Sequence, residues 1–410
     1  MDSSLPEWVT KVFFEQSLRK EENNNNIVVT NLTTSSAVPP GNNYGSFIIR
    51  VELEWKVDGN DSVVKTSRFI VKNELTEGPM KELATEFNLL EPSFYYNFIP
   101  KAKEYCGVNF AAKSFFSPKS TVTILEDLKE KGFVMADRTK LLDFDHCRLY
   151  MLAAASFHSV SVAVFKKHPE ILQPIKKEIR FSNDSKVREL FISLINGGMN
   201  RFIREMEKLV TMKEFLDTVK DITPHLWDIL VETHIPSGEL IKTIKQGDPW
   251  IPNMMFRYDK NDTVCDIKII DFQGTSYGSP ISDLTTFLWS SANFDVKRNR
   301  LGDLYRIYLN SFNENLKLFN CDERLTYDQM MAEVRRFSPL ALYISSSWLP
   351  GLVHPDPLDF SFFFSEDKES EVDKFFGKYY NDEYCAKFLP KVLESLEING
   401  IFNNLVVHRK

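Results

Sequence analysis

Cysteines are few and basic residues form no cluster in this sequence. Its five cysteines are scattered and never occur as a Cys-x-x-Cys pair, which argues against a disulfide framework and against a zinc site. Acidic and basic residues are interleaved along the chain, whose formal net charge is -7, so no basic block is present to neutralise a series of phosphates. We therefore expect no nucleic-acid partner, and nothing in the composition implies a protein partner.

The sequence also lacks a secretory signal and a run long enough to span a membrane. Residues 1–20 carry charges throughout, without the basic start, apolar stretch and small-residue cleavage site of such a signal. The longest uncharged run, residues 337–353, has about 17 residues and contains two prolines, whereas a bilayer span needs ~20 apolar residues. We expect a cytoplasmic protein without membrane contact, in which residues 337–353 form buried helix and turn.

The first third of the chain carries the pattern of an antiparallel sheet. From Ile49 to Trp55, apolar residues alternate with charged ones, which predicts a half-buried strand. The turn signal Asp58-Gly59 separates it from a second predicted strand, residues 67–72, so that the two form a hairpin. A further β-branched strand is predicted at residues 121–125.

Helical patterns dominate the rest of the chain. Periodic apolar residues predict helices over residues 6–20, 79–90 and 143–165, the last with an aspartate as its N-cap. Hydrophobic residues make up 43% of the sequence, enough for a core in one large or two ordinary domains. The pattern predicts an α+β fold of two lobes, with a small antiparallel β-sheet lobe over residues 1–126 and a large, mainly α-helical lobe over residues 127–410.

Asp248, Asn253 and Asp271 surround a predicted β-hairpin in the helical half, with strands at residues 254–258 and 264–270. Closing this hairpin brings Asp271 beside Asn253, which gives two oxygen ligands for Mg²⁺, a cation that completes its octahedron with phosphates and water. Each residue alone would more often mark a polar turn. The ordered spacing, however, is that of kinase catalytic and metal loops, in which Asp248 would accept the proton of the acceptor hydroxyl.

Lys72 and a segment rich in glycine and asparagine predict the nucleotide-binding half of the site. Lys72 ends the strand Phe69-Ile-Val-Lys72, where a cation among apolar neighbours is costly unless an anion meets it, and the phosphates of ATP would do so. The segment Gly41-Asn-Asn43-Tyr44-Gly-Ser46 could fold over phosphates through its backbone N–H groups, although such a segment alone more often marks a turn.

Motifs along nearly the whole chain resemble the ecdysteroid kinase-like proteins of arthropods, also called CHK kinase-like. This family is a branch of the protein-kinase-like fold related to choline kinases and aminoglycoside phosphotransferases. The pairing of Gly-Asp-x-Trp with Asp-Phe-Gln is specific to the branch. The matching segments are Leu5-Pro-Glu-Trp8, Gly41 to Ser46, Phe69 to Lys72, Leu125 to Gly132, Ala155-Ser-Phe-His158, Gly247-Asp-Pro-Trp250 with Asn253, Ile270-Asp-Phe-Gln273, and Tyr277-Gly-Ser-Pro280 with Asp283-Leu284.

The resemblance implies a role for each residue of the central set. Asp248 would be catalytic, Asn253 and Asp271 would bind Mg²⁺, and Lys72 would contact the phosphates of ATP. The backbone of Glu126 to Leu128 would receive the adenine.

Supporting residues include both matches to the family and departures from it. The resemblance implies that Asp283 supports the catalytic loop, whereas its position alone predicts an N-cap for a helix over residues 284–289. His158 also matches a family position, and we assign it no chemistry.

Two residues of the catalytic loop depart from the family. This loop usually opens with His-Gly-Asp, and the histidine is thought to brace the loop by hydrogen bonding. Here Gln246 takes its place, and the Gln246 amide could share those hydrogen bonds. Pro252 replaces a common asparagine and removes one backbone donor.

Two glutamates remain candidates for the partner of Lys72. Glu91 aligns with the family's helix glutamate, but Pro92 directly after it would cost about 3 kcal/mol inside a helix, so the helix must kink or restart there. Glu86 is the competing candidate.

The family implies an alcohol as phosphoryl acceptor, with ecdysteroids as type substrates and detoxification of foreign hydroxylated compounds as a proposed role. The aromatic Phe360-Ser-Phe-Phe-Phe364 and residues 337–353 with Trp348 favour an apolar, steroid-like acceptor, or else simply a phenylalanine-rich core. The departures at Gln246, Pro252 and Pro92 leave an alternative, a pseudokinase-like binding protein for nucleotide or an apolar ligand.

Overall fold

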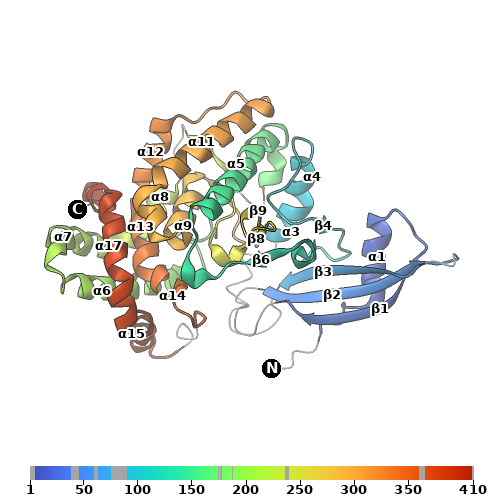
Figure 1. The fold of residues 1–410 in the computed structure, drawn as a ribbon, viewed down its shortest axis with the longest axis horizontal. Helices are drawn as coiled ribbons and strands as arrows, with labels where there is room; N and C mark the ends of the chain where they lie inside the picture. Colours follow the sequence, from blue (N-terminus) through green and yellow to red (C-terminus); the bar gives the residue numbers. More distant parts are fainter. Residues whose placement is uncertain are drawn as a thin grey trace.

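The computed structural model describes residues 5–37, 46–59, 63–74, 90–173, 175, 178–186, 188–235, 240–359 and 365–408. It shows an α+β fold with two lobes, a small one built on an antiparallel sheet and a larger one that is mainly helical (Figure 1). The predicted fold class is confirmed.

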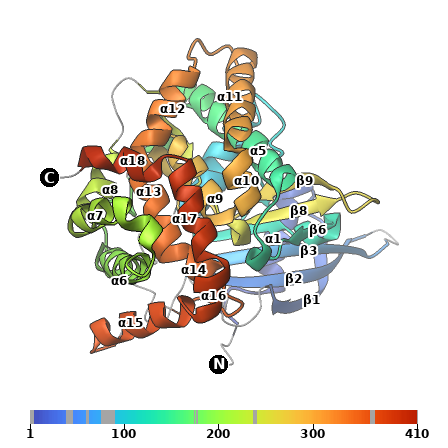
Figure 2. The ribbon, with the colours of Figure 1, turned by 60° about the vertical axis from the view of Figure 1, so that its left-hand side comes forward.

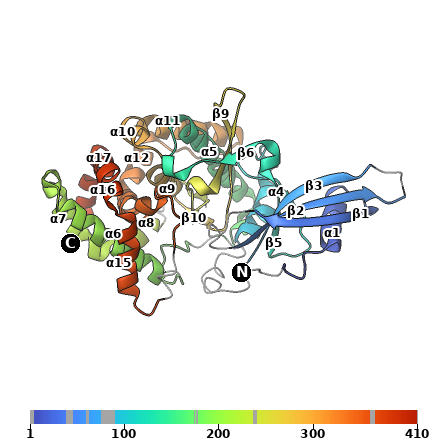
Figure 3. The same cartoon turned by 60° about the horizontal axis from the view of Figure 1, so that its bottom comes forward.

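The small lobe is built on a five-stranded antiparallel sheet. Its strands, in spatial order, are β1 (Ile27–Ser36), β2 (Ser46–Val57), β3 (Lys65–Glu74), β5 (Val122–Glu126) and β4 (Ser114–Phe115). The alternation from Ile49 to Trp55 is confirmed, because its four apolar side chains, those of Ile49, Val51, Leu53 and Trp55, are buried. Lys72 lies on β3, between β2 and β5, and is therefore on an interior strand as expected. Figure 3 shows the sheet projecting to one side of the helical lobe.

The N-terminal helix packs on one face of this sheet but begins later than predicted. Helix α1 spans Lys11–Glu21, and the Thr10 hydroxyl caps it by accepting from the Phe13 N–H. Pro6 lies in a turn before the helix, so the predicted start at residue 6 was wrong: Thr10 supplies the cap that Pro6 cannot. Phe14 is fully buried against the sheet. Strand β1 was not predicted, since only its first residues alternate and most of this edge strand is polar.

A helix leads from the small lobe into the large one. It consists of α3 (Leu90–Ser93), a π-helical segment (Phe94–Phe98) and α4 (Ile99–Ala102). Pro92 lies in α3, two residues before the π-helical segment begins. The predicted helix over residues 79–90 falls outside the described residues except for Leu90.

The large lobe is organised around a long central helix. Helix α5 (Phe144–Lys167) is capped by Asp143 as predicted, and it packs along α11 (Leu301–Leu318). By length and composition α5 alone among the described helices could cross a membrane, yet 67% of its most apolar window is buried inside the protein. The other described α-helices of the lobe, several of which Figure 2 shows from another side, are α6 (Arg188–Met206), α7 (Lys213–Ile222), α8 (Leu226–His234), α9 (Ile281–Ser291), α10 (Phe294–Asn299), α12 (Tyr327–Arg336), α13 (Ser338–Tyr343), α14 (Leu349–Leu352), α15 (Lys368–Tyr379), α16 (Asp382–Lys387), α17 (Leu389–Ile398) and α18 (Ile401–Leu405).

Two small sheets lie between the lobes and carry the site. The predicted hairpin is present as β8 (Met254–Tyr258) and β9 (Val264–Ile269), with β6 (Phe133–Met135) added on its other edge. The second sheet pairs β7 (Thr243–Lys245) with β10 (Ser276–Gly278). Because β7 precedes Gln246 and β9 precedes Asp271, these sheets fix both loops of the candidate site.

Candidate active site

The hairpin brings Asp248, Asn253 and Asp271 together, as its closure predicted. The Ile270 N–H donates to the Asn253 carbonyl at 2.9 Å, which sets the end of β9 beside the turn that holds Asn253. The Asn253 Nδ2 donates to the Asp248 Oδ2 at 3.1 Å and to the Asp248 carbonyl at 2.9 Å. Asn253 therefore uses its amide hydrogens on Asp248, which leaves its Oδ1 as the oxygen for a cation. Pro252 precedes it in the first turn of a 3-10 segment (Ile251–Asn253), where no N–H is required.

Gln246 connects the catalytic loop to the segment that carries Asp271. Its Nε2 donates to the carbonyls of Asp271 at 2.7 Å and Ile270 at 3.2 Å. Its Oε1 accepts from the Asp248 N–H at 2.7 Å, and the residue is buried. The neutral amide of Gln246 thus supplies both a donor and an acceptor that brace the loop. This is what we expected of a glutamine in the position where the family usually has histidine.

Asp283 holds the other side of the catalytic loop. Its carboxylate accepts from the Gln246 N–H at 2.7 Å and from the Gly247 N–H at 3.1 Å, and the His158 Nε2 lies 3.3 Å from it. The ring of His158 also contacts the Tyr308 hydroxyl at 2.9 Å. The predicted N-cap role of Asp283 was wrong, because α9 already begins at Ile281 and places Asp283 in its first turn.

Gly247 allows the loop to pass close to the neighbouring backbone. Its φ is +87°, and a Cβ at this position would lie 2.0 Å from the Gly274 carbonyl oxygen. Any larger residue would have to displace backbone rather than a flexible side chain. Gly247 is therefore required by the close packing of the loop that carries Asp248.

Lys72 reaches across from the small lobe to two carboxylates. Its Nζ lies 2.6 Å from the Glu91 Oε2 and 3.0 Å from the Asp271 Oδ1. Burial alone would lower the pKa of the Lys72 ammonium, but the charges of Asp271 and Glu91 together raise that pKa above its ordinary value. The structure thus pairs Lys72 with Glu91, whereas Glu86 lies outside the described residues.

The segment after β9 is fixed from the small-lobe side as well. The Phe272 N–H donates to the Glu91 Oε1 at 3.1 Å, and the Phe272 ring stacks on Phe94 with centroids 3.8 Å apart. Asp271 itself has a φ of +61°, in the left-handed region that aspartate tolerates better than most residues. The ion pairs and this stack therefore hold Asp271 in one orientation between the lobes.

Only part of the predicted nucleotide-binding segment is described. Gly41, Asn43 and Tyr44 lie outside the described residues, and Ser46 begins β2 opposite Glu74.

The segment predicted to receive the adenine, Glu126 to Leu128, is described. Glu126 ends β5, and its N–H donates to the Lys113 carbonyl at 2.9 Å. Leu128 begins a 3-10 turn and is buried. Contacts to adenine would therefore have to come from backbone groups other than the Glu126 N–H.

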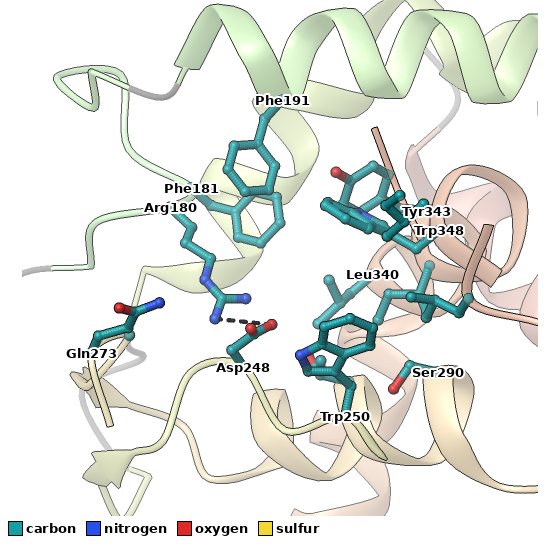
Figure 4. Close-up of a pocket in the computed structure, with 15 residues that line it drawn as sticks. Arg180, Phe181, Phe191, Asp248, Trp250, Gln273, Ser290, Leu340, Tyr343 and Trp348 are labelled. Atoms are coloured by element: carbon teal, nitrogen blue, oxygen red, sulfur yellow. Dashed lines mark ion pairs between the residues drawn. The ribbon is translucent and has the colours of Figure 1, made fainter. Parts of the chain in front are cut away.

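Arg180 is a site residue that the sequence did not indicate. Its guanidinium lies 3.4 Å from the Asp248 Oδ1 and points toward that carboxylate (Figure 4). Burial raises the pKa of Asp248, and the Arg180 charge opposes the rise. No motif marked Arg180, because it lies in an irregular segment 68 residues before Asp248. Asp248 is therefore in contact with both Asn253 and Arg180.

A buried ion pair fixes the segment that carries Arg180. The Lys245 Nζ lies 2.7 Å from the Glu178 Oε2, and the Ser276 hydroxyl donates to the same oxygen at 3.2 Å. Although burial opposes it, the Lys245 charge lowers the pKa of Glu178 strongly. Because Lys245 directly precedes Gln246 and Ser276 lies opposite it on β10, one network holds Arg180 and the catalytic loop.

A cavity of about 250 Å³ opens over Asp248. Asp248 and Arg180 lie on one side of it, and aromatic and aliphatic side chains form most of the rest (Figure 4). Polar residues also line it, namely Gln273, Thr286 and Ser290. Residues 337–353 form part of its wall through α13, a π-helical segment (Ile344–Trp348) and α14, as buried helix and turn. The apolar side chains that line it are Phe181, Phe191, Trp250, Leu340, Tyr343, Ile344, Trp348, Leu352 and Leu358. The predicted aromatic segment Phe360–Phe364 falls outside the described residues.

Comparison with known proteins identifies the family. The model of the ecdysteroid kinase-like family matches residues 40–321, more than two thirds of the chain. The chain belongs to the ecdysteroid kinase-like family. No curated protein matches it. Among solved structures it is similar to a microcompartment-associated aminopropanol kinase, with 11% identity over 95% of this chain and 98% of that chain and a TM-score of 0.33, a likeness too weak to carry an argument.

Membership in the ecdysteroid kinase-like family makes the chain a small-molecule kinase with a kinase-like fold, a class that generally uses ATP and a divalent metal. The residues present fit that use. Among the described residues no group of three or more His, Cys, Asp or Glu could hold a metal by itself. One carboxylate, Asp271, and one amide oxygen, on Asn253, suit Mg²⁺ that takes its other ligands from phosphates and water. Lys72 places a charge beside Asp271 for those phosphates.

Proposed function

We propose that the protein transfers the γ-phosphate of ATP to a hydroxyl group of an apolar compound, with ecdysteroids as the leading acceptor class. The observation that carries this proposal is the position of Asp248 in the wall of an aromatic cavity, beside Arg180 and next to the predicted metal ligands. Aromatic side chains favour a flat or rigid apolar body, and one carboxylate at its edge selects a hydroxyl.

Each residue of the site then has a defined task. Asp248 accepts the proton of the acceptor hydroxyl. Two hydrogen bonds orient Asp248: its carboxylate accepts one from the Asn253 amide, and its N–H donates one to the Gln246 Oε1. Arg180 keeps Asp248 ionised by placing a positive charge beside its carboxylate. Lys72, held by Glu91, offers its ammonium to the phosphates of ATP. When bound at Asn253 and Asp271, Mg²⁺ would supply charge neutralisation for the phosphates.

The departures from the family pattern do not favour the alternative of a binding protein without turnover. Gln246 makes the bracing hydrogen bonds, and Pro252 lies where no backbone donor is needed. Pro92 does not prevent Glu91 from pairing with Lys72. These contacts support a site that keeps the geometry required for transfer.

The proposal is tested by measuring ATP consumption with Mg²⁺ and a panel of ecdysteroids and other hydroxylated ring compounds. We expect turnover with at least one member of the panel and a loss of at least about a hundredfold in Asp248→Asn, because the amide cannot accept the proton. Asp266→Asn is the matched control, since Asp266 lies in β9 in an exposed pair with Arg257. Ligand binding without turnover, unchanged in Asp248→Asn, would support the binding protein instead.

A further inference from the structure

The guanidinium of Arg180 has N–H donors that the protein does not use. Among the residues that the structure describes, it forms one ion pair, with Asp248 at 3.4 Å, and donates no hydrogen bond. A guanidinium that is fully engaged by a carboxylate lies about 2.7–2.9 Å from it and often binds it through two parallel N–H groups. Because a guanidinium carries several donors in a planar fork, those of Arg180 remain open for an anion from outside the chain.

The backbone that carries Arg180 is, by contrast, firmly held. The Arg180 N–H donates to the Glu178 Oε1 at 3.0 Å, while the Glu178 Oε2 pairs with Lys245. The next residue, Phe181, stacks on His234 with ring centroids 4.4 Å apart. The chain therefore sets the place of the guanidinium before a ligand binds, which is the condition for stabilising charge in a transition state without reorganisation.

Gly274 leaves room for the guanidinium over the loop that follows Asp271. A Cβ at Gly274 would lie 3.0 Å from the Arg180 Nη2, tighter than ordinary contact. Gly274 and its neighbour Gln273 line the cavity together with Arg180 and Asp248, and Figure 4 shows Gln273, Arg180 and Asp248 on the same side of it. The open donors thus lie where the catalytic loop and the loop of Asp271 meet.

The two oxygens of the Asp248 carboxylate face different groups. Its Oδ1 lies toward Arg180, and its Oδ2 accepts from the Asn253 amide at 3.1 Å. An acceptor hydroxyl at Asp248 therefore has Arg180 on one side and a predicted metal ligand on the other. The phosphoryl group that this hydroxyl attacks has to approach the same place, and it brings negatively charged oxygens that the open donors of Arg180 suit.

We propose that Arg180 is a further catalytic residue, which binds the phosphoryl group during its transfer from ATP to the acceptor. In this step the acceptor oxygen forms a bond to the γ-phosphorus, and the bond between that phosphorus and the oxygen it shares with the β-phosphate breaks. The hydroxyl proton passes to Asp248, and ADP leaves with the electron pair. Arg180 donates to the phosphoryl oxygens and offsets their repulsion by Asp248. The inference rests on the proposed function and adds a second task to the effect of Arg180 on Asp248.

The test uses aluminium fluoride, which together with MgADP imitates the phosphoryl group during transfer and requires neither an acceptor nor turnover. Calorimetry measures the binding of MgADP to the full chain with and without aluminium fluoride. We expect aluminium fluoride to tighten binding to the wild type, and Arg180→Gln to reduce this gain about 10- to 100-fold without changing the affinity for MgADP alone. Arg180→Lys keeps the charge but not the planar fork and should retain part of the gain.

An effect of Arg180 on the ionisation of Asp248 alone would give a different result. Arg180→Gln would then keep the whole aluminium fluoride gain and would recover the wild-type kcat at a pH that ionises Asp248 in both proteins. We expect instead that its kcat stays at least about tenfold lower on the alkaline plateau. Arg188→Gln, which removes an exposed arginine paired with Glu189, is the matched control and should equal the wild type in both measurements. Thermal unfolding shows that each variant is folded.

The outcomes separate this inference from the proposed function. The inference is overturned if aluminium fluoride tightens MgADP binding equally in the wild type and Arg180→Gln, or in neither. A loss in Arg180→Gln that is confined to the KM of the acceptor would also overturn it, because Arg180 would then bind the acceptor itself. Tightening that depends on Arg180, without transfer to any compound of the ecdysteroid panel, would instead contradict the proposed acceptor class and support the contact of Arg180 with the phosphoryl group.

Discussion

Arg180 and Asp248 form an ion pair at the edge of the cavity that opens over Asp248, with 3.4 Å between the guanidinium nitrogen and the carboxylate Oδ1. The two residues come from different parts of the chain and are held together by the network of Glu178, Lys245 and Ser276. Since the Asp248 side chain is 44% exposed within the cavity, solvent weakens the pair without removing it. The pair therefore tunes the protonation of Asp248 more than it stabilises the fold.

Replacing Arg180 by glutamine should move the pH dependence of turnover. Burial raises the pKa of Asp248 and the Arg180 charge lowers it, so loss of that charge raises the pKa further. Asp248 acts as a base only when deprotonated, and the acid limb of the kcat profile should therefore move to higher pH in Arg180→Gln. Arg188→Gln, an arginine at the start of α6 that pairs with Glu189 in an exposed position, should leave the profile unchanged. An unshifted acid limb in Arg180→Gln would show that Arg180 does not act on Asp248.

Lys72→Ala should weaken ATP binding by about 10- to 100-fold, because a charge-assisted contact to the phosphates is lost. The substitution also leaves Glu91 buried without its partner, so the free energy of unfolding should fall by about 3 kcal/mol. Lys65→Ala is the control on the same strand, since Lys65 is exposed at the start of β3. ATP affinity is measured by calorimetry. If Lys72→Ala and Lys65→Ala bind ATP equally tightly, Lys72 does not contact the nucleotide.

Gln246→His should retain activity, whereas Gln246→Ala should not. A neutral imidazole keeps one donor and one acceptor for the contacts now made to the Asp271 carbonyl and the Asp248 N–H. Alanine leaves these buried groups unpaired, and we expect a loss of about 2 kcal/mol in stability and on the order of tenfold in kcat. Steady-state kinetics and denaturant unfolding of both variants check this. Equal kcat values for the two variants would mean that the side chain braces nothing that matters for turnover.

Gly247→Ala should disrupt the catalytic loop far more than the same change at Gly59. Both glycines have positive φ, +87° and +82°, so alanine strains the backbone at each by roughly 1–2 kcal/mol. Only at Gly247 does the new Cβ also meet backbone, the Gly274 carbonyl oxygen at 2.0 Å, whereas nothing lies within 4 Å at Gly59. Thermal unfolding and kcat should both fall in Gly247→Ala, and kcat should be unchanged in Gly59→Ala. If Gly247→Ala and Gly59→Ala lower the unfolding temperature and kcat to the same extent, the strain of a positive φ alone explains the loss, and the contact with Gly274 does not matter.

Features with a regular period could be predicted from the sequence, and features without one could not. The alternation in β2, the hairpin of β8 and β9, and the Asp143 cap of α5 all follow from local pattern. Strand β1 escaped prediction because a polar edge strand has no apolar period. The start of α1 was misplaced since a capping hydroxyl outweighs a proline that fits a first turn.

The candidate site divides in the same way. Asp271 was predicted to lie beside Asn253 because one hairpin joins them, and the hydrogen bond from the Ile270 N–H to the Asn253 carbonyl shows that closure. Arg180 could not be predicted, since its approach to Asp248 depends on tertiary packing between segments far apart in the chain.

The central claim is tested most directly by following the γ-phosphoryl group itself. The protein is incubated with Mg²⁺ and ATP labelled in that group, together with a hydroxylated ring compound, and the products are identified by mass spectrometry. The account predicts a labelled phosphate ester of the acceptor in equal amount to ADP, and its loss in Asp248→Asn while ATP binding persists. ATP and acceptor binding without any labelled ester, or ester formation that Asp248→Asn leaves intact, would contradict it.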